Sequence, residues 1–300
     1  MSALARRLAA ASTVFAVSLA TVLVAAPAHA ADPPMCGDTI MTDTVLTADL
    51  VCDGSTDGLI IGAAGVTLDL GGHTISGPGA YATPRAGVRV AQLSGVTVTR
   101  GTVSGFQSGV VLDEAWGASV TKLAVVGNDQ GINLAGGGGH RVAQNTVSDN
   151  GRDGIRLGLS ARNTVTQNTV DGNVWGITVA NGSSANVVSR NAVTGSEAVG
   201  LSSFDRTTGT VFSQNTVAGG WGEGIVTSDD TTSNTVSQNK SIANGGTGIR
   251  VANALVVKNT ATDNGGQGIV ASGVSSDGGG NKAAGNLLSP QCSGVVCSIP

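Results

Sequence analysis

The stretch Thr166–Ile177, TQNTVDGNVWGI, has the small polar residues of a surface loop, yet its outline recurs along most of the chain. The outline is a Gly followed by an aliphatic residue, as in Gly176-Ile177, and, from Asn145 onward, an Asn such as Asn168. Two residues after the Asn comes Val in four copies and Ser241 or Ala261 in the last two. Self-similarity at a fixed period is the signature of a structural repeat rather than of a loop.

Two columns of residues define the repeat. Short G-[VIL]-x-x segments, 20 to 24 residues apart, begin at Gly87, Gly109, Gly131, Gly154, Gly176, Gly200, Gly224, Gly248 and Gly268. An earlier relative starts at Gly58, and residues 77–85 form an inserted loop before the next copy. The second column is Asn145, Asn168, Asn191, Asn215, Asn239 and Asn259.

Each repeat contains three β-rich pieces separated by turns. Gly-Ile-x-Val places apolar residues at alternate positions, which predicts a half-buried strand, and two shorter pieces flank the Asn. No segment after residue 30 has a sustained 3.6-residue period, so we expect no helix there. About 22 residues per repeat is too short for a propeller blade and favours a solenoid of stacked turns.

The Gly-Ile-x-Val strands and Asn-Thr-Val turns resemble the repeat of right-handed, pectate-lyase-like parallel β-helix proteins, from about Gly58 to Asn286. The resemblance implies an all-β, single-stranded right-handed parallel β-helix of about ten coils, with three short strands per coil. In that family inward Asn side chains stack at one tight turn, where an amide can satisfy backbone groups above and below. Asn also tolerates left-handed backbone angles. The Asn-x-Thr pattern fits a glycosylation acceptor as well.

The first 30 residues have the pattern of a secretory signal. Arg6 and Arg7 precede an apolar run, and Ala28-His29-Ala30 forms an A-x-A cleavage site; an uncleaved anchor is the alternative. We therefore expect a secreted, extracellular chain with no membrane insertion after cleavage. The expected parts are a signal peptide at 1–30, an N-terminal cap at 31–57, the β-helix domain at 58–286 and a C-terminal cap at 287–300.

Charge and composition exclude some partners. Without the signal the net charge is 14 − 20 = −6, so the sequence lacks the basic footprint of a nucleic-acid-binding protein. Aromatic residues make up 3% and charged residues 12% of the chain, while the regular recurrence of Val, Ile and Leu argues against disorder. The sequence does not specify an oligomeric state.

The four cysteines lie where the ends of a rod need support. Cys36 and Cys52 fall near one end and Cys292 and Cys297 near the other, so we expect a local disulfide at each end. No cysteine has the CxxC spacing of a zinc site, so we predict no metal and no cofactor.

Two acidic residues on neighbouring coils form the candidate catalytic site. Asp205 and Asp229 share one register, and Arg206 and Asp230 follow them. Stacked carboxylates repel, so one should hold a proton or share a cation; such pairs catalyse glycoside hydrolysis or bind Ca²⁺. No specific calcium motif is present. Alternatively, Asp simply starts turns well and Arg206 neutralises Asp230.

Tryptophans and arginines form the candidate binding site. Trp175 and Trp221 precede strands two coils apart and can stack on sugar faces or cover the edge of a slim core. Trp116 belongs to another turn. Arg156 and Arg250 lie in the outward column two residues after the strand Gly and are candidate substrate-binding residues, but they are not adjacent and form no continuous basic stripe.

Two functional hypotheses follow. The first is a secreted β-helix that binds polysaccharide or cell-wall glycan, or acts as a scaffold, without a recognisable catalytic motif. The second is a polysaccharide-active enzyme, a hydrolase, lyase or epimerase, acting on the outer face near Asp205 and Asp229. The chain lacks the Asn-Thr-Asp, Gly-His-Gly and Arg-Ile-Lys set of polygalacturonase-like hydrolases and the Asp-Pro-His-Asp motif of alginate epimerases.

Overall fold

The computed structural model describes residues 33–300, which form one compact unit of 33 strands. No helix occurs among these residues, and none of their segments forms a helix that would be long and apolar enough to span a membrane. The predicted signal peptide, residues 1–30, lies outside the described residues.

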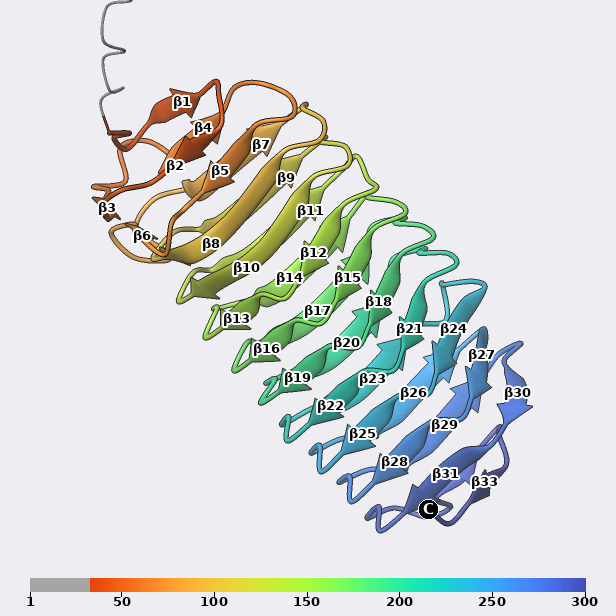
Figure 1. Cartoon of the computed structure of the whole chain (residues 1–300). Coiled ribbons are helices and arrows are strands. Elements are labelled where there is room, and N and C mark those ends of the chain that lie inside the picture. Colours follow the sequence, from red (N-terminus) through yellow and green to blue (C-terminus); the bar gives the residue numbers. More distant parts are fainter. Residues whose placement is uncertain (1–32) are drawn as a thin grey trace, which may run out of the picture. The chain divides into compact units, whose positions relative to one another are not determined.

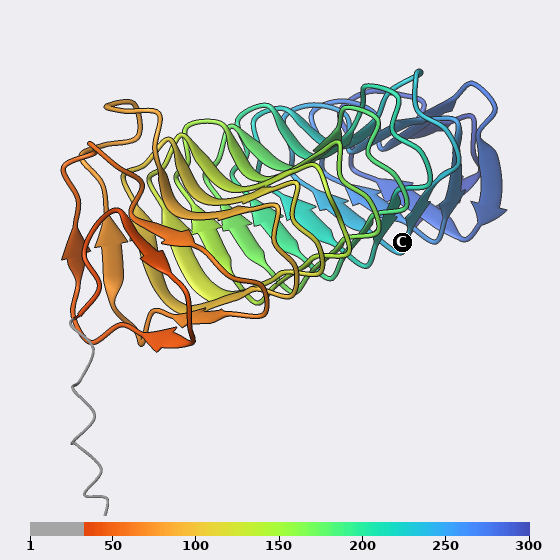
Figure 2. The same cartoon turned by 90° about the horizontal axis from the view of Figure 1, so that it is seen from above.

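The strands wind into a parallel β-helix, in which each turn pairs with the turns before and after it (Figures 1 and 2). The first sheet has twelve parallel strands in sequence order, more than the ten coils that the repeat predicts, because a strand is added at each end. They are β1 (Asp38–Ile40), β4 (Leu59–Ile61), β7 (Ala86–Ala91), β9 (Ser108–Asp113), β11 (Gln130–Ala135), β14 (Asp153–Gly158), β17 (Trp175–Ala180), β20 (Val199–Ser203), β23 (Glu223–Thr227), β26 (Ile249–Ala252), β29 (Ile269–Ser272) and β32 (Cys292–Ser293).

The other strands complete the turns. After each first-sheet strand comes a second strand: β2 (Thr44–Val45), β5 (Thr67–Asp69), β8 (Thr97–Ser104), β10 (Ser119–Val126), β12 (Arg141–Ala143), β15 (Thr164–Thr166), β18 (Val187–Ser189), β21 (Val211–Ser213), β24 (Asn234–Ser237), β27 (Ala254–Val257) and β30 (Ser276–Gly279). The third strands are β3 (Leu50–Val51), β6 (Thr74–Ser76), β13 (Thr146–Ser148), β16 (Thr169–Asp171), β19 (Ala192–Thr194), β22 (Thr216–Ala218), β25 (Lys240–Ile242), β28 (Thr260–Thr262), β31 (Asn281–Ala284) and β33 (Cys297–Ser298). β8 and β10 are longer, and each serves as both the second and the third strand of its turn.

Aliphatic side chains from all three strands fill the narrow interior. In one turn Val165, Val170 and Ile177 are fully buried. The strand-opening glycines are required by close packing: a Cβ at Gly176 would lie 2.3 Å from the carbonyl oxygen of Gly200 and 2.5 Å from a methyl of Val193. The glycine column therefore keeps the interior thin.

The predicted asparagine ladder is present and extends to Asn281. Asn168 accepts hydrogen bonds at Oδ1 from the N–H and the side-chain amide of Asn145 and donates to the carbonyl of Val142, and the same pattern continues along the column. The left-handed residue at this corner is not the Asn, however, but the residue before it, such as Gln167 with φ 58°. The bend is thus made one residue earlier, which leaves Asn free to point inward.

Two further ladders stand at the other corners, which the sequence did not reveal. Between the third strand and the next first strand, the ladder consists of Asn128, Asn150, Asn173, Asn244, Asn264 and Asn286. Between the first and second strands, the ladder consists of His140, Asn163, Asn186 and Asn234. The ladder from Asn128 to Asn286 is called the second-corner ladder below, and the ladder from His140 to Asn234 is called the third-corner ladder. The ladder from Asn145 to Asn281 stands at the first corner.

Both further ladders are interrupted in the turn of residues 191–214. Ser196 replaces Asn in the second-corner ladder and Thr210 replaces it in the third-corner ladder. The hydroxyl oxygens of Ser196 and Thr210 are buried and have no hydrogen-bond partner among the described residues. Gly220 extends the second-corner gap by one turn, up to Asn244.

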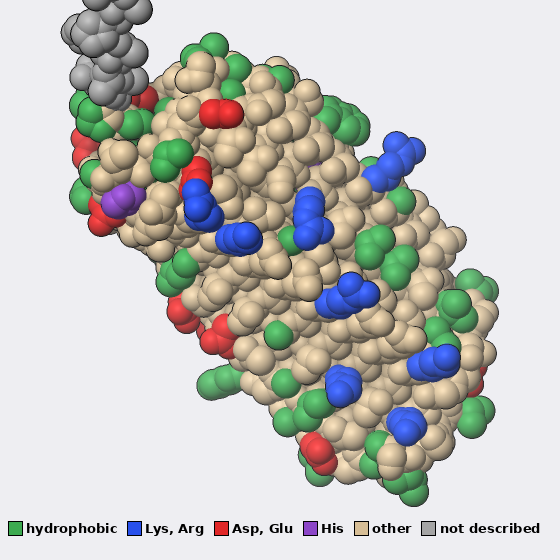
Figure 3. All heavy atoms as spheres, viewed as in Figure 1, with side chains coloured by type: hydrophobic (Ala, Val, Ile, Leu, Met, Phe, Trp, Pro, Cys, Tyr) green, Lys and Arg blue, Asp and Glu red, His purple; other side chains and the backbone are tan. Residues whose placement is uncertain are grey.

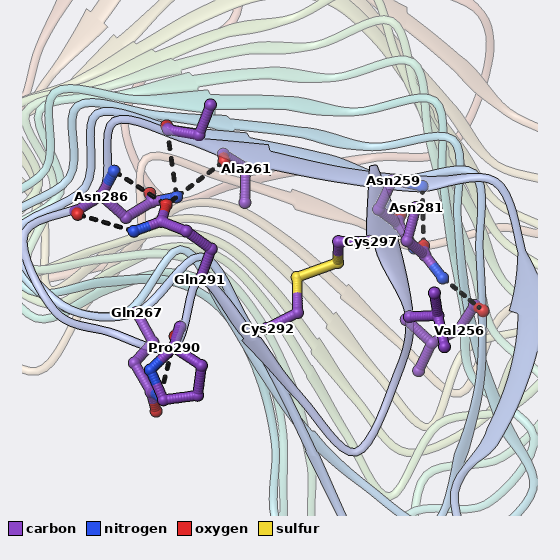
Figure 4. Close-up of a disulfide and its surroundings, with 12 residues drawn as sticks. Val256, Asn259, Ala261, Gln267, Asn281, Asn286, Pro290, Gln291, Cys292 and Cys297 are labelled. Carbon is purple, nitrogen blue, oxygen red and sulfur yellow. Dashed lines mark hydrogen bonds between the residues drawn. A yellow bond between two sulfur atoms is a disulfide. The ribbon is translucent and has the colours of Figure 1, made fainter. Parts of the chain in front are cut away.

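Disulfides close both ends, as predicted. Cys36 pairs with Cys52, and Cys292 pairs with Cys297. Figure 4 shows the C-terminal bond lying between the ends of two ladders. There Gln291 accepts a hydrogen bond from the amide of Asn286 at 2.7 Å. β1 to β3, within the expected N-terminal cap, pair with β4 to β6 as a turn of the solenoid; the cap boundaries themselves stay predictions.

Candidate functional site

The loop of residues 77–85, between β6 and β7, reaches along the solenoid over the turns that follow it. Its Tyr81 is 77% exposed, and its hydroxyl lies against Gly151, where an added Cβ would be 1.9 Å from it. Asp129 Oδ1 lies 3.7 Å from that same Cβ position. The loop therefore overhangs the approach to β11 and β14.

Beside this loop, the outward face of β7, β9 and β11 is hollowed. A groove of about 270 Å³ is lined by Arg85, Ala86, Arg89, Gln107, Ser108, Val111, Asp113, Asp129, Gln130, Asn133, Ala135 and Arg152. A second hollow of about 240 Å³ lies under the loop, between residues 80–84 and the side chains of Gln107 and Asp129. Because both hollows share Gln107 and Asp129, we treat them as one site, the loop groove.

Buried carboxylates fix the arginine side chains of the loop groove in place. Asp57 receives Arg89 Nε at 2.5 Å and the N–H of Ala86 at 2.8 Å. Burial raises the pKa of Asp57, but these hydrogen bonds outweigh it and keep the pKa below its ordinary value; Asp57 in turn raises the pKa of Arg89. The Asp57–Arg89 pair thus stays ionised and holds the guanidinium in the groove wall.

Among the residues that line the groove, Asp129 has a buried side-chain oxygen without a hydrogen-bond partner. It is 5% exposed, its Oδ2 lies 3.6 Å from Arg152 Nη1, and its Oδ1 has no hydrogen-bond partner among the described residues. A buried oxygen left unpaired in this way costs free energy unless a ligand supplies a donor.

Further along the solenoid, aromatic side chains lie over the outward face of the first sheet. Trp175, at the start of β17, and Phe204, just after β20, have ring centroids 6.0 Å apart. Between them on the outward face, Thr178 and Ser202 are only 0% and 2% exposed, so we infer that the two rings cover them. Trp175 is therefore engaged with another ring, and its predicted role in sugar stacking stays a prediction.

The two tryptophans lie in different columns of the solenoid. Trp175 pairs with Val199, whereas the N–H of Trp221 binds the carbonyl of Ser196, which puts Trp221 beside Glu197. Counted from the second corner, Trp175 is the second residue after Asn173, whereas Trp221 is the first residue after Gly220. Trp221 is 83% exposed and borders a hollow of about 470 Å³ with Gly172, Gly195 and Glu197.

The acidic residues of the predicted catalytic site lie on exposed turns after β20 and β23. Asp205 and Asp229 hold matched positions, since the pairings on both sides of them keep an offset of 24 residues. Asp230 accepts the N–H of Arg206 at 3.1 Å and the hydroxyl of Ser228 at 2.5 Å. The Ser228 hydroxyl, with the Arg206 amide, lowers the pKa of Asp230, which keeps it an acceptor. Catalysis at this site stays a prediction.

The two predicted binding arginines each pair with a carboxylate. Arg250 makes two bonds to Glu223, at 2.6 and 2.5 Å, and Glu223 raises its pKa. Arg156 Nη1 lies 3.6 Å from Asp153 Oδ2. On the face seen in Figure 3, Lys and Arg side chains likewise lie singly rather than in a continuous stripe. Substrate binding by Arg156 and Arg250 stays a prediction.

Sequence reasoning missed the loop groove because its parts come from different turns. The available signal was the spacing of 29 residues between Gly58 and Gly87, against 20 to 24 elsewhere, with the chain's one Tyr in the insertion. Nothing in the sequence indicated that this loop reaches Gly151.

Two family models match the chain. The model described as "Periplasmic copper-binding protein (NosD)" matches residues 71–240, and the model described as "Right handed beta helix region" matches residues 203–288. Among curated proteins, none matches this sequence. The second match gives the handedness of the β-helix, as predicted.

The described residues do not fit the copper named in that description. Copper prefers Cys, Met and His ligands, but all four cysteines form disulfides, His140 is buried in a ladder and His73 contacts Asp49 at 3.2 Å. Within residues 33–300 no three His, Cys, Asp or Glu side chains converge as a metal site would require.

Solved structures with this fold cover most of the chain. The A-module of mannuronan C-5 epimerase AlgE6 from Azotobacter vinelandii is 14% identical, with a TM-score of 0.66 over 86% of this chain and 91% of that one. The AlgE4 A-module of the same organism is 14% identical, with a TM-score of 0.60 over 76% and 72%. A double mutant of the periplasmic alginate epimerase AlgG is 13% identical, with a TM-score of 0.57 over 85% and 72%. These likenesses show the fold, and the family match over residues 71–240 shows that the chain belongs to the family described as periplasmic copper-binding protein (NosD).

Proposed function

We propose that this chain is an exported β-helix protein that binds an acidic polysaccharide in the loop groove. The carrying observation is Asp129, a carboxylate that lines both hollows and whose buried Oδ1 has no hydrogen-bond partner among residues 33–300. A sugar hydroxyl in the groove is a suitable donor for this carboxylate. Arg85, Arg89 and Arg152 on the same walls suit the carboxylates of uronic acids, which guanidinium groups bind through paired hydrogen bonds.

The loop adds an aromatic side chain to this polar groove. Tyr81 stands over Gly151 beside Asp129, and its ring offers an apolar face with a polar tip, a combination that suits the face of a sugar ring. The epimerases named above have this fold and, by their titles, act on mannuronan or alginate, which supports an acidic glycan as ligand.

Location outside the cytosol is part of the proposal. Both disulfides need an oxidising compartment, and the matching family is described as periplasmic. The signal-like residues 1–30 further support export. The proposal covers both the periplasm and secretion out of the cell.

A polysaccharide-active enzyme is the second candidate. The observation that favours it is the position of Asp129 beside Arg152 in a groove that also contains Asp113. A carboxylate can take a proton from a sugar while an arginine holds the sugar's own carboxylate. The predicted set of Asp205, Asp229, Asp230 and Arg206 is the competing location for this chemistry.

The test is retention on immobilised polysaccharides, with galacturonan, mannuronan, alginate and a neutral glucan as probes. We expect retention on an acidic polymer, and about a tenfold loss in affinity for Asp129→Asn and for Arg152→Gln. Arg141→Gln, an exposed arginine on another face, serves as the matched control and should bind as the wild type does.

Product analysis separates the two candidates. Reducing ends, unsaturated sugars and epimer content are followed after incubation with each retained polymer. Binding without products supports the first candidate; products that vanish in Asp129→Asn support the second at the groove, and products that vanish in Asp205→Asn place the chemistry on the turns. Retention on none of the four polymers contradicts the proposal.

A further inference from the structure

A single column of residues connects the loop groove with Trp221. It consists of the residues that directly follow the second-corner positions, among them Asp129, Gly151, Val174, Glu197 and Trp221. The N–H of Gly151 binds the carbonyl of Asn128, that of Glu197 binds Asn173, and that of Trp221 binds Ser196. The stacked side chains of Asn150 and Asn173 align Val174 with Gly151.

Two exposed aromatic rings stand on this column. Tyr81 covers it at Gly151, and Trp221 projects from it three turns further on. Adjacent parallel strands lie about 4.8 Å apart, so three turns separate the two positions by about 14 Å along the solenoid axis. Between them only the side chains of Val174 and Glu197 rise from the column.

The surroundings of Trp221 form a shallow receptor rather than a packed edge. The hollow of about 470 Å³ beside it is bordered by Gly172, Gly195 and Glu197. The two glycines carry no side chain and leave one face of the turn open. The carboxylate of Glu197, which is exposed, can accept hydrogen bonds from hydroxyl groups. An aromatic face next to such an acceptor suits a sugar ring.

We propose that Trp221 and Glu197 form a second sugar subsite, and that one linear polysaccharide chain lying parallel to the solenoid axis contacts Tyr81 and Trp221 together. This inference rests on the proposed glycan-binding function and adds the direction and minimum length of the ligand. Linking two contacts in one ligand makes the second one intramolecular, so affinity rises once the ligand is long enough to reach both.

The experiment measures affinity against ligand length by calorimetry. The probes are oligogalacturonates and oligomannuronates of two to eight residues, with cello-oligosaccharides as neutral probes. The proteins are the full mature chain, Trp221→Ala, Tyr81→Ala and the control Trp116→Ala. Trp116 is also exposed, at 57%, but lies at a different corner, between Ser94 and Gly138 in the bridge column.

Oligomers long enough to span about 14 Å should bind the wild type and Trp116→Ala about tenfold more tightly than shorter oligomers do. Trp221→Ala should show no such gain in affinity with length. Tyr81→Ala should bind all lengths more weakly. Equal length dependence in Trp221→Ala and the wild type overturns this inference and leaves the proposed function intact. Binding of no probe by the wild type overturns both.

Discussion

The turn of residues 145–167 and the turn of residues 191–214 have the same three strands but different corners. The first has Asn at every corner, Asn145, Asn150 and Asn163, whereas the second has Asn191, Ser196 and Thr210. In the second turn both replacements leave a buried hydroxyl without a partner, while Asn191 keeps all its ladder bonds.

The three corners therefore differ in how strongly they require Asn. β15 and β16 are joined by two residues, Gln167 and Asn168, so no other group is near enough to satisfy the backbone there. Three residues join β16 to β17 and six join β17 to β18, which gives the chain other ways to arrange its hydrogen bonds. The tightest corner keeps Asn in every turn from Asn145 to Asn281, and the looser corners do not.

Removing one residue from the complete ladder should have the largest effect. Asn168→Ala removes the acceptor of the backbone N–H of Asn145 and the amide that donates to the carbonyl of Val142, while Oδ1 of Asn191 keeps the backbone N–H of residue 168. Since each buried polar group left unpaired costs about 1–3 kcal/mol, we expect a loss of about 4 kcal/mol in the free energy of unfolding. Denaturant titration measures it, with exposed Thr169→Ala as control. A loss below that of the control variant would contradict the special status of this corner.

Acid should weaken the third-corner ladder at His140. Burial lowers the pKa of His140 to about 4, with the backbone of Ala115 opposing the shift. Because the unfolded chain takes up the proton near pH 6.5 and the folded chain only near 4, stability is complete above about 6.5 and falls by about 3 kcal/mol as pH drops to 4.

The matched variant for this effect is His140→Asn, which continues the ladder formed by Asn163 and Asn186. An Asn oxygen can accept the N–H of Ala118 as His140 Nδ1 does, without titrating. The difference in unfolding free energy between pH 7 and pH 4.5 should shrink by about 2 kcal/mol in the variant. The same difference in both proteins would show that His140 does not control acid stability.

Restoring Asn in the interrupted turn should have the smallest effect on stability, and it should stabilise the protein. In Thr210→Asn the new side-chain oxygen can accept the N–H of Asn186, just as Oδ1 of Asn186 accepts the N–H of Asn163. The substitution also removes an unpaired hydroxyl. We expect a gain of about 1 kcal/mol in the free energy of unfolding. Exposed Thr208→Asn is the control. A destabilised Thr210→Asn protein would mean that this corner has no room for the ladder.

The sequence predicted those features that repeat without exception. The strand glycines recur from Gly58 to Gly268 and the ladder asparagines recur from Asn145 to Asn259. The glycines follow from close packing and the asparagines from a two-residue corner. The other ladders were missed because His140, Ser196 and Thr210 break their pattern. The loop groove was missed because an inserted loop has no period: the contact of Tyr81 with Gly151 depends on how the loop folds, and the burial of Asp129 depends on turns far apart in sequence.

The two disulfides affect where this solenoid is expected to open first. In a stack whose turns touch only their neighbours, unfolding ordinarily starts at a free tip and travels inward. Here a disulfide closes each terminal turn on itself, at Cys36–Cys52 and at Cys292–Cys297, whereas the turn of residues 191–214 has two unpaired hydroxyls in its interior. We therefore expect local opening at the turn of residues 191–214 to compete with fraying of the tips, and reduction of the disulfides to favour the tips.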